Sequence, residues 1–167
     1  MAVSLTIIKA EETPALPRNL HIRPATAADI PALMVLEKHA ATAAHWSIAQ
    51  YQAAFSGEGP SRVALVLEAQ ASMRGFLIGR VLDQEWEIEN IAVTGPARRR
   101  GLGTRLLGEF LEMARSGGAK AIFLEVRESN LAARDLYEKC AFAESGRRKL
   151  YYREPDEDAI VYRIDLP

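Results

Sequence analysis

The sequence contains almost no cysteine, and this scarcity excludes several kinds of protein. Cys140 is the single cysteine in 167 residues, so no disulfide can form within the chain, which fits a reducing compartment such as the cytoplasm. The three histidines, His21, His39 and His45, lack the spacing and the cysteine partners of a metal site. We therefore expect a cytoplasmic protein with neither a metal nor a disulfide framework.

Long apolar runs and a strong charge of one sign are also missing. No stretch is apolar for long enough to span a bilayer, and the first residues lack the basic-then-apolar layout of a secretory signal. The net charge is −1, so nothing global attracts the chain to nucleic acid or to a membrane. With 49% hydrophobic residues, the chain has enough apolar material for the core of one globular domain. We expect a monomer or a weak dimer.

The periodicity of the apolar residues predicts a mixed α/β fold. Residues 1–19 show weak periodicity and are expected to be an N-terminal extension to one domain over 20–167. Helices are predicted to start at capping boxes over 26–29 and 47–50, the second with Ile48, Tyr51 and Phe55 on its apolar side, and to cover 101–115 and 130–140. Strands are predicted over 20–23, 62–68, 74–83, 85–94, 121–126 (buried on both faces), 143–152 and 159–165. The order β-α-α-β-β-β-α-β-α-β-β implies a mixed sheet with helices on both faces.

A basic, glycine-rich loop precedes the helix predicted over 101–115. It reads Arg98-Arg99-Arg100-Gly101-Leu102-Gly103-Thr104. Glycine lets a backbone approach a ligand, and a helix start offers unpaired N–H groups and a positive dipole end, so the loop suits a pyrophosphate. A Walker A loop is excluded because no Gly-Lys-Ser/Thr is present, and the dinucleotide pattern G-x-G-x-x-G fails at Leu106. On the loop alone, a solvated basic turn is an equal alternative.

Three further side chains are candidates for chemistry. Glu125 follows four apolar residues in a strand expected to be buried, where a carboxylate is costly unless it is used or paired. Burial would raise its pKa toward that of a general base, while a salt bridge to Arg127 or Arg134 is the alternative. Tyr137, taken alone, would be a core tyrosine, and Asn130, taken alone, would be a helix N-cap.

Together these pieces resemble the GNAT superfamily of acetyltransferases. The basic loop matches the Q/R-x-x-G-x-G/A acetyl-CoA motif of that family, and the order of elements matches over about residues 20–166. The segments HWS (45–47), NIAV (90–93), LEVRESN (124–130), LYEKCAF (136–142), RRKLYY (147–152) and EDAIVY (157–162) are similar to those of its protein N-terminal acetyltransferases. The likeness is greatest to enzymes that modify the N-terminal alanine of a small-subunit ribosomal protein. It implies acetyl transfer from acetyl-CoA to a protein α-amine, with a ribosomal protein as partner.

The same resemblance implies roles for the matched residues. Glu125 would be the general base, acting through water, and Tyr137 would lie beside the leaving sulfur. The implied acetyl-CoA contacts are the backbone of Ile91, Ala92 and Val93, the pyrophosphate loop Arg98, Arg99, Arg100, Gly101, Leu102, Gly103 and Thr104, and the side chain of Asn130 at the pantetheine arm. The implied peptide-binding residues are Trp46, Glu87, Glu89, Tyr151 and Tyr152.

Glu87 is a second candidate for the base. It lies four residues before Ile91, where histone acetyltransferases of the same fold carry their base, and strand alternation would place Glu87 and Glu89 on the face of Ile91 and Val93. The LEVR setting favours Glu125, which leaves Glu87 or Glu89 to bind the substrate ammonium. Two other functions stay open: an acetyltransferase acting on lysine or a small amine, and a non-catalytic acyl-CoA sensor that would need no base.

Overall fold

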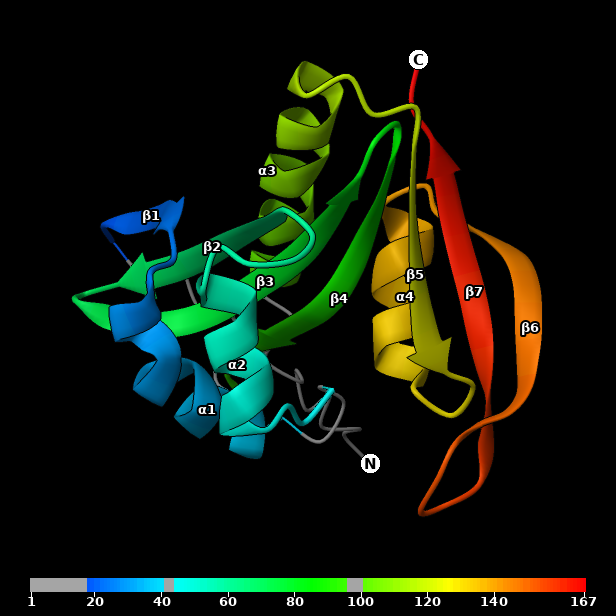
Figure 1. Ribbon diagram of the computed structural model, residues 1–167, viewed down its shortest axis with the longest axis horizontal. Helices are drawn as coiled ribbons and strands as arrows, with labels where there is room; N and C mark the ends of the chain where they lie inside the picture. Colours follow the sequence, from blue (N-terminus) through cyan, green and yellow to red (C-terminus); the bar gives the residue numbers. More distant parts are fainter. Residues whose placement is uncertain (1–17, 41–43, 96–100) are drawn as a thin grey trace, which may run out of the picture.

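The computed structural model describes residues 18–40, 44–95 and 101–167, which form a seven-stranded sheet with helices on both faces (Figure 1). The strands are β1 (Leu20–Pro24), β2 (Arg62–Ala69), β3 (Ser72–Leu82), β4 (Glu85–Val93), β5 (Ala121–Arg127), β6 (Ala143–Tyr152) and β7 (Glu157–Asp165). They lie in the order β1-β2-β3-β4-β5-β7-β6, and β4 and β5 are the parallel pair while the other neighbours are antiparallel. This confirms the predicted mixed sheet.

The helices begin and end where local signals place them. In the described residues they are α1 (Ile30–Lys38), preceded by a 3₁₀ turn at Ala27–Asp29, then α2 (Ile48–Phe55), α3 (Leu102–Ser116) and α4 (Leu131–Lys139). At α2, Ser47 Oγ accepts from Gln50 N at 3.2 Å while Gln50 Oε1 accepts from Ser47 N at 2.8 Å, which is the predicted capping box. The left-handed backbone of Gly101 (φ 75°) leads into α3, and Gly117 ends it.

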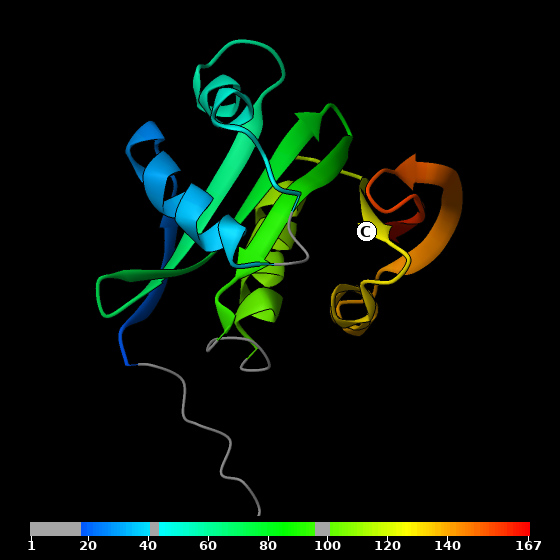
Figure 2. The ribbon, with the colours of Figure 1, turned by 90° about the horizontal axis from the view of Figure 1, so that it is seen from below.

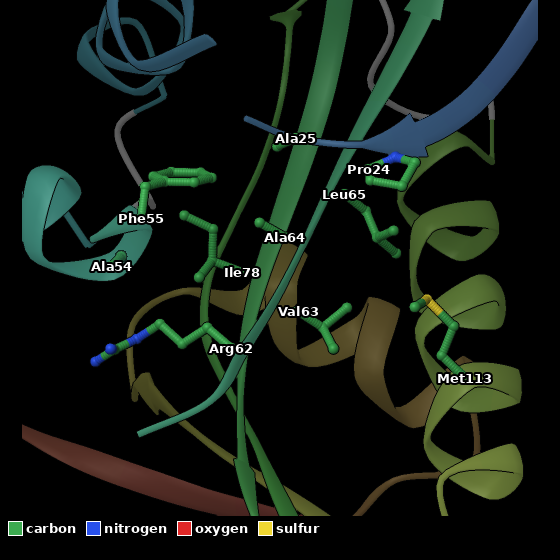
Figure 3. A pocket seen from close by; sticks show the side chains of 10 residues that line it. All are labelled: Pro24, Ala25, Ala54, Phe55, Arg62, Val63, Ala64, Leu65, Ile78 and Met113. Atoms are coloured by element: carbon green, nitrogen blue, oxygen red, sulfur yellow. The ribbon is translucent and has the colours of Figure 1, made fainter. Parts of the chain in front are cut away.

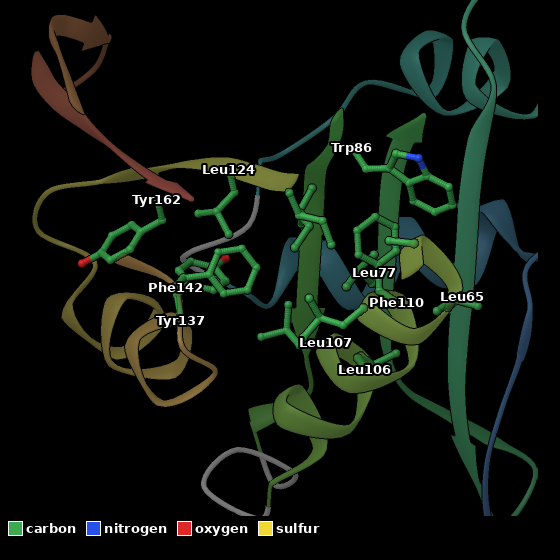
Figure 4. Packing of buried hydrophobic residues seen from close by; sticks show 14 of the residues in the cluster. Leu65, Leu77, Trp86, Leu106, Leu107, Phe110, Leu124, Tyr137, Phe142 and Tyr162 are labelled. Carbon is green, nitrogen blue, oxygen red and sulfur yellow. The ribbon is translucent and has the colours of Figure 1, made fainter. Parts of the chain in front are cut away.

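Two apolar clusters hold the helices to the two faces of the sheet. Figure 2 shows α1 and α2 on one side and α3 and α4 on the other. One cluster joins Leu33 of α1 and Tyr51 of α2 to the strand residues Val66, Phe76 and Ile78. The other, under α3 and α4, joins Leu106 and Phe110 of α3 to the strand residues Leu65, Leu77 and Leu124 (Figure 4). The burial of each such leucine or phenylalanine side chain contributes about 1.5–3 kcal/mol to the stability of the fold. Successive side chains of β2 and β3 point to opposite faces of the sheet, so neighbouring residues of these strands belong to different clusters.

Two expectations about burial are wrong. Ile48 was expected on the apolar side of α2, but it is 53% exposed, and Tyr51 is the buried residue of that helix. Strand β5 was expected to be buried on both faces, but on one face Phe123 and Glu125 keep a minor part of their surface exposed. Their side of β5 faces away from α3 and α4, and it carries the candidate chemistry described below.

Candidate active site

Strands β4 and β5 stop pairing halfway along their length. Their parallel register covers Glu85–Ile88 against Ala121–Leu124, while β4 continues beside β3 as far as Val93 and β5 continues beside β7 as far as Arg127. Beyond Ile88, the edge of β4 that faces β5 therefore has no strand partner within the described residues. Such an edge can accept an extended ligand through main-chain hydrogen bonds. Residues 91–93, predicted to meet pantetheine, lie on this edge.

A β-bulge sits in β4 at the point where the two strands separate. Ile78 of β3 lies opposite Asn90 and Gly79 lies opposite Ile88, so Glu89 is the extra residue. A bulge locally bends its strand and changes which face the following side chains occupy.

The bulge corrects one prediction about the faces of β4. Ile88 packs in the cluster under α3, and so do Ile91 and Val93 on the far side of the bulge. Glu87 alternates with Ile88 and so lies on the opposite face of the sheet, the face covered by α1 and α2. The expectation that Glu87 and Glu89 share a face with Ile91 and Val93 was wrong, because it assumed a regular strand.

Glu125 lies on the same face of the sheet as Glu87, and its carboxylate forms an ion pair with an arginine. Its side chain is 13% exposed, and Arg148 Nε of β6 lies 2.6 Å from its Oε1. The pKa of Tyr151 is raised, and its interaction with the Glu125 carboxylate is the largest cause. The alternative salt bridges are not formed, since Arg127 pairs with Glu157 and Arg134 with Glu144.

Glu87 and Glu89 are each held by an arginine. Glu87 pairs with Arg80 of β3, and Glu89 Oε2 lies 2.7 Å from Arg62 Nε of β2. The side chains of both glutamates are less than one-fifth exposed, at 17% and 14%. Arg80 Nε also lies 3.8 Å from Glu89 Oε1, so the two carboxylates share a small network with two arginines.

Tyr137 lies on the other side of β5, in the cluster under α3 and α4. It is 5% exposed, and its ring centroid lies 6.0 Å from that of Phe142 and 5.9 Å from that of Tyr162 (Figure 4). Burial is the main cause that raises the pKa of Tyr137, and the nearby Tyr152 raises it further. The phenol therefore keeps its proton at neutral pH and can donate a hydrogen bond.

Tyr152 lies within electrostatic range of both candidate catalytic groups. Burial, and then the charge of Glu125, raises the pKa of Tyr152 to about 12. The guanidinium carbon of Arg127 lies 4.4 Å from the centre of its ring, and Arg127 also donates to the carbonyls of Arg153 and Pro155. Arg127 thus fixes the end of the β6–β7 hairpin against β5, a role that its sequence setting did not reveal.

Asn130 caps α4, as its alternative role predicted. Its Oδ1 accepts from Ala133 N at 3.1 Å. The predicted contact of Asn130 with pantetheine stays a prediction, for which its Nδ2 is the available donor.

The described part of the basic loop adds one packing role. Arg98, Arg99 and Arg100 lie outside the described residues. A side chain at Gly103 would bring its Cβ within 3.0 Å of Leu136 Cδ2, so this glycine permits the close approach of α3 to α4. Burial raises the pKa of the Cys140 thiol, and the nearby Thr104 partly opposes this effect.

Two polar residues of this region were missed by motif reasoning. Glu37 and Asn90 are each 3% exposed and hydrogen-bond each other at 2.8 Å. Trp46, predicted to shape the peptide groove, donates its backbone N–H to Glu37 and packs on Tyr51 with ring centroids 5.3 Å apart. The only signal for Glu37 in the sequence is its place in the apolar spacing of α1.

Two hollows in the described part of the surface lie largely away from this chemistry. One of about 280 Å³ wraps the edge of β2, between Phe55 of α2 and Met113 of α3, and contains none of the predicted site residues (Figure 3). A second, of about 570 Å³, lies against α1 and includes Val93. In the described ranges no cluster of three or more potential metal-binding side chains occurs, and no helix is long and apolar enough to cross a membrane.

Comparison with known proteins decides the family. The family model described as Acetyltransferase (GNAT) family matches residues 30–142. The chain belongs to the GNAT acetyltransferases. A ribosomal protein bS18-alanine N-acetyltransferase from Salmonella typhimurium is 36% identical over 140 residues, covering 83% of this chain and 92% of that protein. The N-alpha-acetyltransferase RimI of Mycobacterium tuberculosis is 41% identical over 88 residues, covering 53% of this chain and 54% of that protein.

Solved structures place the GNAT chain in the same fold. The ribosomal-protein-S18-alanine N-acetyltransferase from Escherichia coli superposes with a TM-score of 0.78 at 32% identity, covering 87% of this chain and 93% of that one. Arabidopsis thaliana NAA60, whose structure is in complex with acetyl-CoA, gives a TM-score of 0.76 over 88% of this chain and 98% of its own. At 16% identity this second likeness concerns the fold alone. The chain is therefore a GNAT N-acetyltransferase similar to the RimI enzymes.

Proposed function

We propose that this enzyme transfers acetyl from acetyl-CoA to the N-terminal α-amine of a protein, and that its substrate is a small-subunit ribosomal protein with an N-terminal alanine. The observation that carries the proposal is the 36% identity to a ribosomal protein bS18-alanine N-acetyltransferase, which extends over 92% of that relative. The site geometry supports it, because a carboxylate and a buried phenol lie on the two sides of β5 beside the free edge of β4.

In this proposal acetyl-CoA enters where β4 and β5 separate. The backbone of residues 91–93 pairs with the pantetheine arm in the manner of an added strand. The pyrophosphate lies on the loop over 98–104, where the N-terminal N–H groups of α3 and the arginines meet its charge. Glycine at 101 supports this assignment, because its φ of 75° turns the chain into α3.

The α-amine approaches from the face that carries Glu125. Glu125 removes its proton through water, the neutral amine attacks the thioester carbon, and a backbone N–H of β4 holds the oxyanion. The carbon–sulfur bond then breaks, and Tyr137 donates a hydrogen bond to the leaving thiolate. The second proton of the attacking nitrogen passes to that thiolate, so that an amide and the thiol of CoA are released. A thiol has a pKa of about 8.5, so this thiolate needs little further help.

Arg148 must leave Glu125 for this reaction. Its side chain is 59% exposed, so its ion pair with Glu125 contributes little to stability and can open into solvent. The ammonium of the substrate then replaces the guanidinium as the partner of the carboxylate. Tyr151, which is 49% exposed and close to Glu125 and Glu87, forms the lip over which the peptide backbone runs. In this proposal Trp46, Glu89 and Tyr152 also line the groove.

A peptide panel tests the proposed function. Peptides that differ in their first residue, incubated with acetyl-CoA and analysed by mass spectrometry, should be acetylated fastest when that residue is alanine. The two tyrosines of the lip leave limited room beside the first Cα, so large first residues should react more slowly. Faster turnover of polyamines or other small amines than of any peptide would contradict the proposal.

Acetyl-CoA binding gives a separate test that needs no peptide. Acetyl-CoA at 100 times its Kd should add about 2.7 kcal/mol to the free energy of unfolding of the wild-type protein. Its melting temperature should rise accordingly. Replacing Arg98, Arg99 and Arg100 by glutamate should abolish this shift. Arg115→Glu, at the other end of α3, is the matched control and should keep it.

Gly103 is a poorer position for this test, although a side chain there would also face the proposed pyrophosphate. Its Cβ would meet Leu136, so a loss of binding could arise from the disturbed contact between α3 and α4. An unchanged thermal shift in the triple variant would contradict the assignment of the loop.

A further inference from the structure

Glu37, on α1, is a buried carboxylate that the proposed reaction does not use. Its Oε1 accepts from Trp46 N at 3.0 Å and from Asn90 Nδ2 at 2.8 Å, and its Oε2 accepts from Tyr51 OH at 2.7 Å. Glu37 and Asn90 are each 3% exposed, and Tyr51 is fully buried. Both oxygens of the carboxylate are thus satisfied by donors from three different segments.

The carboxylate is expensive for the fold. Burying a charge costs several kcal/mol unless its partners compensate, and an apolar side chain of similar volume is often at least as stable. In the described part of the chain the donors to Glu37 are neutral groups, and no lysine, arginine or histidine forms an ion pair with it. The stability of the fold alone therefore does not explain why a glutamate occupies position 37. Its hydrogen bonds do explain it, because they hold three segments of the chain in fixed directions.

Those hydrogen bonds fasten the connection between α1 and α2 to β4. Trp46 N donates to Glu37, and Ala44 N approaches Asn90 Oδ1 at 3.4 Å. Asn90 directly follows Glu89, the extra residue of the bulge. The Trp46 ring packs on Tyr51, which itself is bonded to Glu37. One carboxylate therefore joins the candidate wall of the peptide groove to the place where β4 leaves β5.

We propose that Glu37 is a positioning residue for the peptide substrate: it holds residues 44–46 against the bulge of β4 and so fixes the Trp46 side of the groove before the peptide arrives. A groove fixed in advance avoids the entropic cost of ordering a loop during binding. The inference rests on the proposed function for its kinetic part, while the anchoring itself is a property of the free protein.

Kinetics of three variants test the positioning role. Glu37→Ala removes the acceptor for Trp46, Tyr51 and Asn90, and should raise the KM for peptide roughly tenfold or more with the KM for acetyl-CoA little changed. Glu37→Gln should stay within about threefold of wild type, because its oxygen can accept from Trp46 and Asn90 while its amide donates to the phenol oxygen.

Leu33→Ala is the matched control for lost stability. Leu33 is fully buried four residues earlier on the same helix, and it packs in the same cluster without anchoring the connection. It should destabilise the protein by about 2–5 kcal/mol and leave the KM for peptide nearly unchanged below the melting transition. An equal rise of that KM in Leu33→Ala, or no rise in Glu37→Ala, would overturn the proposal.

Hydrogen exchange of the Trp46 amide separates this inference from the proposed function. Relative to the amide of Leu77 in the sheet, the Trp46 amide should exchange at least about tenfold faster in Glu37→Ala than in wild type, and at the wild-type ratio in Glu37→Gln and Leu33→Ala. A Trp46 amide equally protected in Glu37→Ala would refute the anchor. Failure of the wild type to acetylate any peptide would instead refute the proposed function, and the exchange result would still stand.

Discussion

Glu125→Gln should lower the turnover of peptide acetylation by roughly 10²–10⁴ at neutral pH and leave acetyl-CoA affinity nearly unchanged. Glutamine keeps the shape of the side chain but cannot take a proton from the substrate ammonium. The variant should fold normally, because the lost ion pair involves Arg148, whose side chain is 59% exposed. Steady-state rates on an alanine-starting peptide, with acetyl-CoA affinity measured by thermal shift, check both parts.

The pH dependence of Glu125→Gln gives a second signature. Without the base, the reaction depends on amine that is already neutral, so turnover should rise about tenfold per pH unit below the α-amine pKa of about 8 and level off above it. The wild type should rise less steeply over the same range.

Glu87→Gln is the control within the same face of the sheet. Its partner Arg80 is 32% exposed, against 59% for Arg148 beside Glu125, so the carboxylate of Glu87 is the less easily released of the two. Glu87→Gln should therefore affect turnover far less than Glu125→Gln. The assignment of the base fails if Glu87→Gln proves much the more damaging of the two.

The elements of the fold could be read from the sequence because their signals are local. The Ser47 box specifies the start of α2 within four residues, and the glycines at 101 and 117 bound α3. The alternation of side chains between the two faces of the sheet can be recognised within the sequence of β2 or of β3 alone. These features depend on residues that are neighbours along the chain, so no tertiary information was required to place them.

The site was less predictable because its details depend on residues far apart in sequence. No residue type in β4 predicts that Glu89 is the extra residue of a β-bulge. The bulge follows from the way in which β3 pairs with the two halves of β4. The sequence suggested Arg127 or Arg134 as the partner of Glu125, but the partner is Arg148, which reaches it from β6 across the intervening strand β7. Glu37 lacked a motif altogether, because its partners are Trp46, Tyr51 and Asn90.

The placement of Glu125 and Tyr137 on opposite sides of β5 bears on the order of events. An amine that meets Glu125 comes from the face of α1 and α2, whereas a thioester beside Tyr137 lies toward α3 and α4. The two reactants can meet only where β4 and β5 no longer pair, beyond Ile88 and Leu124. Acetyl-CoA, which fills that opening in the proposed function, would complete the floor of the peptide groove, so we expect cofactor to bind before peptide.

A peptide that starts with alanine and contains lysines should be acetylated at its α-amine alone, and blocking that amine beforehand should reduce acetylation at least about 100-fold. The proton balance of the two amines supplies the reason. At pH 7.4 an α-amine with a pKa of about 8 is about one-fifth neutral, whereas a lysine amine with a pKa of about 10.4 is about one-thousandth neutral. A single carboxylate such as Glu125 offsets the first deficit more readily than the second.

Fragmentation by mass spectrometry locates the added acetyl group, and two matched peptides serve as controls. The same sequence with arginine in place of each lysine should react at the wild-type peptide's rate, because lysine plays no part. The same sequence with an acetylated N-terminus should stay unmodified. Efficient acetylation of lysine in the blocked peptide would show that the groove accepts a long side chain past Tyr151, and would contradict the proposed N-terminal substrate.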